Sequence, residues 1–113
     1  MLLIIRKKAD EDTIHKISED LNGYVKVTVD VKRGILAAGG TLHVDSERLL
    51  LEDGSRQADL WGGGIDFETG GLDFDSMINI RPAQENRARE VLDLKIRKHM
   101  EEIIHRLDRK SVV

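Results

Sequence analysis

The chain of 113 residues contains no cysteine. Disulfide bonds, thiolate zinc sites and a cysteine nucleophile are therefore excluded, and the fold depends on packing alone. Aromatic residues are also scarce, with one Trp, one Tyr and two Phe, and there is a single proline.

Long hydrophobic runs are absent as well. The opening MLLII is followed at once by Arg6, Lys7 and Lys8, so it is too short for a signal-peptide core and its charges lie on the wrong side. No apolar run approaches the roughly 18 residues of a transmembrane helix. We interpret MLLII as a strand, predict no membrane contact and expect a cytoplasmic location.

The composition is that of a folded, soluble protein, with 35% charged and 40% hydrophobic residues. A chain of this length supports one hydrophobic core. We therefore expect a single α+β domain over residues 1–113, with residues 110–113 as a frayed tail. Residues 1–80 hold 9 Lys and Arg against 15 Asp and Glu, whereas residues 81–110 hold 9 against 6. The acidic body argues against broad nucleic-acid binding, while the basic C-terminal part leaves local anion or nucleic-acid contact open.

Hydrophobic periodicity predicts the elements in order. Residues 9–23 place Ile14, Ile17 and Leu21 on one helical face, and Asn22-Gly23 is a stop signal. YVKVTVDV alternates strictly, so it predicts a hairpin with ILAAGGTLHV. ERLLLEDG is typical of a short helix that Asp45 or Ser46 would cap and Gly54 would end.

The second half of the chain is predicted in the same way. The glycines of WGGGIDFETGG predict an interrupted strand with a bulge near residues 62–64 and a turn at Gly70-Gly71. LDFDSMINI resumes a two-residue period up to Pro82, and a final helix capped by Asp93 has a regular apolar face: Ile96, Met100, Ile103, Ile104 and Leu107. The order predicts an α+β fold with a mainly antiparallel sheet of about four to five strands, and with the C-terminal helix and a shorter N-terminal helix packed on one face.

Three motifs carry a resemblance to a known family: GG-x-LH-x-D, GS-x-Q-x-DLWG and FDSMINIRP-x-Q-x-NR-x-R. In this order they resemble a family of small uncharacterised prokaryotic proteins that is catalogued only as a domain of unknown function. The likeness covers nearly the whole chain. It implies no assigned activity, cofactor or partner and no catalytic residue.

The segment FDSMINIRPAQENRAR, residues 74–89, concentrates polar side chains. On a strand, Asp75, Asn79 and Arg81 project to one side together with Asp73, and Gln84, Asn86, Arg87 and Arg89 follow in a turn. Arginine suits bidentate carboxylate or phosphate binding, and Asn and Gln direct hydrogen bonds. One hypothesis is an anion or nucleotide-like site at Arg81, Arg87 and Arg89.

Two other hypotheses account for the same segment. In the structural alternative it is a polar network, with Arg81 paired to Asp75 or Asp73 and with Gln84 and Asn86 capping backbone groups. In the other, it belongs to an interface with another subunit.

Other candidate positions lie outside this segment. LHVD places His43 and Asp45 two residues apart, on one face if the strand extends that far, where they could orient a general base or bind a metal with Asp75 as a third carboxylate. Trp61 is either a stacking platform or core. His15, His99 and His105 are expected to face solvent.

We therefore predict a binding or interaction module for a small anionic ligand or a protein partner. The complete predicted site comprises His43, Asp45, Gln57, Trp61, Asp75, Asn79, Arg81, Gln84, Asn86, Arg87 and Arg89. The alternative is a small hydrolase or phosphoryl-handling enzyme that uses His43, Asp45 and Asp75 with Arg81 and Arg87; it requires His43 and Arg81 to face one cleft. A homo-oligomer formed through an edge strand or the last helix is a third hypothesis. No motif identifies a cofactor, and we assign neither a metal site nor catalytic residues.

Overall fold

A five-stranded antiparallel sheet forms the centre of the computed structural model, which describes residues 1–107. The strands are β1 (Leu3–Ile5), β2 (Tyr24–Asp30), β3 (Ile35–Ala38), β4 (Leu60–Asp66) and β5 (Leu72–Asp73), in the order β1-β3-β2-β4-β5. The α-helices are α1 (Glu11–Ser18), α2 (His43–Glu52) and α3 (Leu94–Ile104). Short 3-10 turns are η1 (Gln57–Asp59), η2 (Met77–Asn79), η3 (Pro82–Gln84) and η4 (His105–Leu107). The predicted α+β fold is confirmed, and the predicted tail at 110–113 lies outside the described residues.

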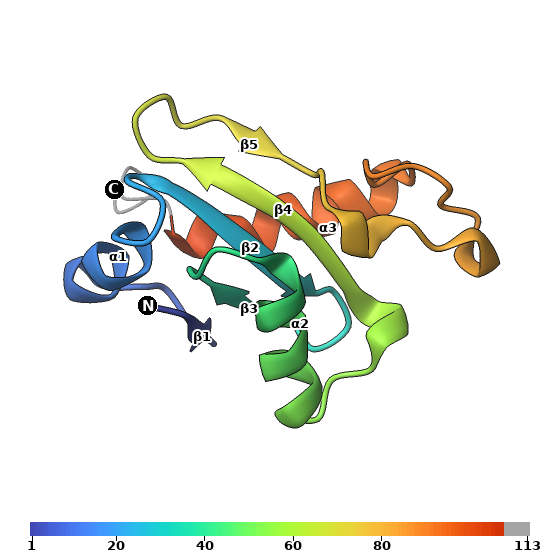
Figure 1. The fold of residues 1–113 in the computed structure, drawn as a ribbon, viewed down its shortest axis with the longest axis horizontal. Helices are drawn as coiled ribbons and strands as arrows, with labels where there is room; N and C mark the ends of the chain where they lie inside the picture. Colours follow the sequence, from blue (N-terminus) through green and yellow to red (C-terminus); the bar gives the residue numbers. More distant parts are fainter. Residues whose placement is uncertain (108–113) are drawn as a thin grey trace.

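Helices cover both faces of the sheet (Figure 1). Alternate residues of β2 point to one face, where Val25, Val27 and Val29 are fully buried against apolar residues of α1 and α3. The opposite face holds a smaller cluster, in which Leu50 of α2 packs with residues of β3 and β4. Helices α1 and α3 therefore share one face as predicted, and α2 covers part of the other.

The start of α3 follows the predicted signal at Asp93, whereas α1 ends at Ser18, before the predicted stop at Asn22-Gly23. Asp10 caps α1 by accepting a hydrogen bond from the Thr13 N–H at 2.8 Å, and Asp93 caps α3 by accepting one from the Lys95 N–H at 2.8 Å. After α1, Asn22 and Gly23 adopt positive φ angles of 54° and 97°. No described helix is long and apolar enough to cross a membrane.

The region around His43 differs from the prediction. Strand β3 ends at Ala38, because Gly39 and Gly40 have φ angles of 103° and 72° that leave the extended region. Helix α2 then begins at His43, so the strand does not extend far enough for His43 and Asp45 to share a strand face. The predicted capping of this helix by Asp45 or Ser46 is also wrong, since both lie inside it, whereas Gly54 ends it with φ 104° as expected.

The glycine-rich segment also differs from the prediction. Strand β4 runs without a bulge through Gly62, Gly63 and Gly64, each paired in register with a residue of β2. The predicted bulge is therefore wrong, although the predicted turn is present, with Gly70 at φ 77°. Neighbouring side chains fill the space that side chains at Gly62 and Gly64 would take.

The predicted strand over residues 72–80 is mostly wrong. Strand β5 has only Leu72 and Asp73, and the chain then leaves the sheet for η2 and η3. Asp75, Asn79 and Arg81 therefore do not project from one strand face. Two isolated bridges, Asp75 with Glu90 and Arg81 with Asn86, close this segment into a compact loop beside β4.

Candidate functional site

The outer edge of β4 is covered by side chains where β5 stops. Asn79 is fully buried; its Oδ1 accepts a hydrogen bond from the Gly62 N–H at 2.8 Å, and its Nδ2 donates to the Gly62 carbonyl at 2.9 Å. The same Nδ2 lies 3.2 and 2.9 Å from the carbonyls of Phe74 and Arg89. A buried peptide group without a partner is costly, so the Asn79 amide takes the place of a neighbouring strand.

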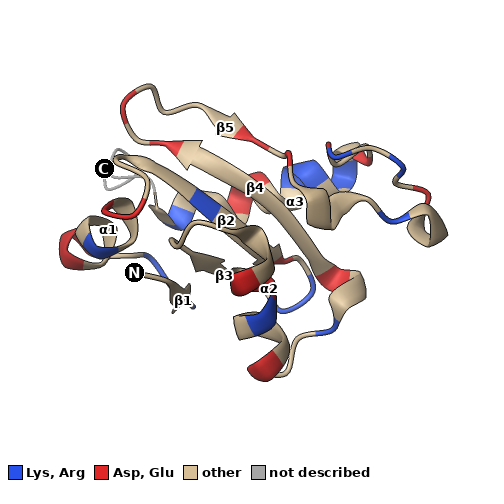
Figure 2. Cartoon of the chain, in the orientation of Figure 1, with Lys and Arg blue, Asp and Glu red and all other residues tan. Residues whose placement is uncertain are grey.

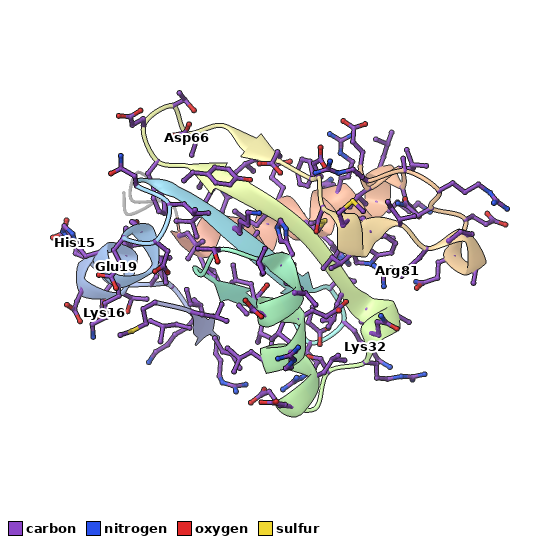
Figure 3. The ribbon with its side chains drawn as sticks, in the orientation of Figure 1. His15, Lys16, Glu19, Lys32, Asp66 and Arg81 are labelled. Atoms are coloured by element: carbon purple, nitrogen blue, oxygen red, sulfur yellow. The ribbon has the colours of Figure 1, made fainter. Side chains whose placement is uncertain are left out.

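Arg81 continues this cover toward the start of β4, where Figure 3 labels it. Its guanidinium donates to the carbonyls of Gln57, at 2.6 Å, and Leu60, and stacks on the Trp61 ring with 3.8 Å between Cζ and the ring centroid. The Nε of Arg81 is buried and has no acceptor among the described residues. Arg81 is therefore bound to backbone carbonyls, and Asp73 and Asp75 have other partners.

Asn86 and Gln84 fix the loop that follows. The Nδ2 of Asn86 donates to the carbonyls of Asn79, Ala88 and Glu90 at 2.7 to 3.0 Å, and its Oδ1 accepts from the Leu92 N–H. Gln84 donates to the Ala58 carbonyl at 3.0 Å. The hypothesis of a structural polar network predicted that Gln84 and Asn86 cap backbone groups, and these hydrogen bonds agree with it. Both side chains are therefore bonded to the backbone.

A separate cavity of about 490 Å³ lies beside α2, and we call it the His43 cavity. Tyr24 and Lys26 of β2, the start of α2 at residues 42–44, the loop residues 73 and 75–77, and Arg89 line it. Of the predicted site, His43, Asp75 and Arg89 meet here. The cavity is open to solvent and combines charged, aromatic and apolar side chains.

The glycines of β4 make room for this arrangement. A Cβ added at Gly62 would lie 2.6 Å from the Ser76 Cβ and 3.1 Å from the His43 Cδ2, and one at Gly64 would lie 2.5 Å from the Tyr24 Cζ. Those separations are shorter than carbon–carbon van der Waals contact. Any side chain at either position would displace a residue that lines the cavity.

His43 is held in one tautomer by the central sheet. Its Nε2 lies 2.7 Å from the Gly63 carbonyl, and because a carbonyl only accepts, Nε2 carries the proton and Nδ1 is the unprotonated nitrogen of the neutral ring. Burial lowers the pKa of His43, and the positive charge of Lys26 acts in the same direction against smaller opposing effects of the Gly63 carbonyl, Asp73 and Asp75. The first turn of α2 is itself anchored, since Ser46 Oγ donates to the His43 carbonyl and lies 2.6 Å from Thr28 Oγ1.

The charged groups of the cavity are mostly paired. The Tyr24 hydroxyl donates to Asp73 Oδ2 at 2.6 Å, and its burial together with this carboxylate raises the tyrosine pKa. Asp75 pairs with Arg89 at 3.0 Å between Oδ1 and Nε. Lys26, by contrast, makes no hydrogen bond or ion pair through its ammonium group with any part of the chain that the structure describes.

The remaining predicted residues lie elsewhere. Asp45 is half-buried in the first turn of α2, and Arg87 is exposed. Trp61 is 2% exposed and belongs to the core on the α1 and α3 face. His43 lines the cavity on the α2 side and Arg81 does not, so the single cleft that the enzyme hypothesis requires is not formed.

Several residues that line the cavity were not among the predicted site residues: Tyr24, Lys26, Leu42, Val44, Asp73, Ser76 and Met77. For Tyr24 and Lys26 a signal existed, because the alternation of β2 places them together on the face opposite the valines. Within residues 1–107, no group of three or more His, Asp or Glu side chains could hold a metal ion.

Comparison with known proteins identifies a family. The family described as "Protein of unknown function (DUF5674)" matches residues 3–107, and the chain belongs to it. No curated protein and no solved structure matches the chain. The predicted membership of a domain family of unknown function is thus confirmed.

Proposed function

We propose that the chain is a binding module that takes a small anionic ligand in the His43 cavity. The observation that supports this most strongly is the ammonium group of Lys26. It lines a cavity of about 490 Å³, in the size range of small-molecule sites, and none of residues 1–107 offers it a hydrogen-bond or ion-pair partner. An ammonium group that has no hydrogen-bond or ion-pair partner in an open cavity can bind an anion.

The groups around Lys26 favour a bound ligand, rather than a side chain of the same protein, as the partner of its ammonium group. Asp73 already accepts from Tyr24 and Asp75 pairs with Arg89, so both nearby carboxylates are occupied. The neutral His43 ring, with its Nε2 proton held by Gly63, adds no negative charge that would oppose an anion. Lys26 is consequently the one basic group of the cavity with its charge available to a ligand.

The proposed site includes part of the polar segment at residues 74–89 that was noted in the sequence. Asp75 and Arg89 come from residues 74–89, whereas Arg81, Gln84 and Asn86 of that segment bond to backbone carbonyls. The anion is therefore proposed to bind beside this loop, on the α2 side. Residues 84–89, which we call the arginine-rich turn, would support the loop residues that line the cavity. Acidic and basic residues are interspersed along this loop and α3 in Figure 2, as expected for a solvated surface.

A thermal-shift screen tests the proposal. Wild type, Lys26→Met and Lys32→Met are compared with phosphate, acetate, longer carboxylates, nucleotides, short RNA and divalent metals. A ligand at about 100 times its Kd stabilises by about 2.7 kcal/mol, which moves Tm by on the order of 10 °C for a domain of this size. Lys32 is exposed in the turn after β2, so Lys32→Met removes the same charge outside the cavity.

The expected result is a shift with an anion that Lys32→Met keeps and Lys26→Met loses while remaining folded. A shift that survives in Lys26→Met but disappears in Arg87→Ala would move the site to the arginine-rich turn. No shift with any anion would contradict the proposed function.

A further inference from the structure

Apolar side chains gather at the rim of the His43 cavity. Leu42, Val44 and Met77 are 54%, 46% and 65% exposed, and all three line the cavity. Leu42 and Val44 flank His43 at the start of α2, and Met77 lies opposite in η2. Exposed large apolar residues are ordinary when scattered, but a group of them around one concave site indicates contact with an apolar partner.

The pairing of the charged groups in the cavity limits the charge of the ligand. Lys26 and Arg89 contribute two positive charges, and Asp73 and Asp75 contribute two negative charges. The ring of His43 is neutral at neutral pH because burial lowers its pKa. One negative charge on the ligand matches the unpaired ammonium of Lys26. A second would have to lie near Asp73 and Asp75 without a free cation, and like charges at short distance repel.

Taken together, these two features define a chemical class. We infer that the ligand is a monocarboxylate with an apolar body, whose carboxylate pairs with Lys26 and whose hydrocarbon part lies on Leu42, Val44 and Met77. This inference rests on the proposed function and specifies its ligand. Inorganic phosphate and nucleotides fit less well, since they carry more than one charge near neutral pH and phosphate has no apolar part.

Calorimetric titration with matched small probes tests this inference. Hexanoate, hexan-1-ol, acetate and phosphate are titrated into wild type, and hexanoate shares its charge with acetate and its chain with hexanol. We expect hexanoate to bind about tenfold more tightly than acetate, because burial of methylene groups is favourable, and more tightly than hexanol or phosphate.

Variants distinguish the contact of the carboxylate with Lys26 from the contact of the hydrocarbon chain with the apolar rim. Met77→Ser and Val44→Ser, both at exposed positions, should weaken hexanoate binding and leave acetate unchanged. Lys26→Met should weaken the binding of both hexanoate and acetate. Leu94→Ser is the matched control, since Leu94 is 75% exposed and does not line the cavity.

The outcomes distinguish this inference from the proposed function. Equal affinity for acetate and hexanoate, or tighter binding of phosphate, would overturn the monocarboxylate and leave an anion site. Equal binding of hexanol and hexanoate, unaffected by Lys26→Met, would overturn the carboxylate contact. No binding of any anion would overturn both.

Discussion

The side-chain amide of Asn79 forms with Gly62 the pair of hydrogen bonds that a neighbouring strand would form. The Gly62 N–H donates to Asn79 Oδ1 at 2.8 Å, and Asn79 Nδ2 donates to the Gly62 carbonyl at 2.9 Å. Strand β5 pairs only with Gly64 and Ile65 of β4, so the amide closes the edge beyond it. Because Asn79 is fully buried, this pairing also fixes the loop that forms one wall of the His43 cavity.

Replacing Asn79 with alanine should therefore be among the most destabilising polar substitutions. It would leave the Gly62 peptide group without its partner and remove two further contacts to the Phe74 and Arg89 carbonyls. We expect a loss of about 3 kcal/mol in the free energy of unfolding, since each buried unsatisfied group costs about 1–3 kcal/mol.

Urea denaturation of Asn79→Ala measures this loss. Gln84→Ala, which removes one exposed hydrogen bond to Ala58, is the control and should cost less than about 1 kcal/mol. Equal stability of the two variants would refute the role assigned to Asn79.

Gly64→Ala should destabilise the fold through the ring of Tyr24. The new Cβ would lie 2.5 Å from the Tyr24 Cζ, in a region where backbone on both sides is fixed by the sheet. We expect a loss of about 1–3 kcal/mol, the usual effect of overpacking. Gly71→Ala is the comparison, because its nearest neighbour is a side-chain oxygen of Thr69 at 3.1 Å.

A double-mutant cycle with Tyr24→Ser checks the cause. Removing the ring should relieve the overlap, so the combined loss of unfolding free energy should be smaller than the sum of the two single losses. If the losses of the two single variants simply add, the strain in Gly64→Ala does not arise from the Tyr24 ring.

Periodic segments of the chain were predictable from sequence, because each combines an apolar repeat with local capping residues. Asp93 caps the helix it was expected to cap, and the valines of β2 face the core. These features depend on neighbours in the sequence, so the one-dimensional pattern contains them.

Features that depend on distant partners were not predictable. Gly62 and Gly64 have an ordinary strand conformation, and their requirement for glycine comes from His43, Ser76 and Tyr24. The alternation over residues 72–80 indicated a strand, but the structure uses the Asn79 side chain where the prediction placed backbone. For the candidate site, His43, Asp75 and Arg89 were predicted from the sequence. The alternation of β2 indicated only the face on which Lys26 lies, and the cavity on that face depends on residues distant in the sequence.

Arg81→Lys should not be a conservative substitution. A lysine cannot reproduce the planar stack on Trp61 together with two hydrogen bonds to the carbonyls of Gln57 and Leu60. We expect a loss of about 2 kcal/mol in the free energy of unfolding, which is the order of magnitude of one cation–π contact and one hydrogen bond. Trp61 is the only tryptophan, so its fluorescence reports the change directly. Arg87→Lys, at an exposed position, should leave both stability and emission unchanged.

His43 should make stability fall in mildly acidic solution. Burial lowers its pKa in the folded chain below the usual value of 6.5, so the unfolded chain binds the proton first as the pH decreases. The contribution of neutral His43 is therefore fully present above about pH 6.5 and is lost between that pH and the lower pKa of the folded state.

Urea denaturation between about pH 8 and pH 5 tests this dependence. The stability of wild type should fall more steeply over this range than that of His43→Gln. His15→Gln, at an exposed position, should follow wild type. Parallel curves for wild type and His43→Gln would contradict a buried neutral imidazole.

Chemical-shift mapping by NMR locates the ligand site residue by residue. Hexanoate is titrated into ¹⁵N-labelled wild type and the amide signals that move are assigned. We expect saturable shifts at Lys26, His43 and residues 73–77, with no such shifts in Lys26→Met. Shifts confined to residues 84–89, or none that saturate, would contradict it.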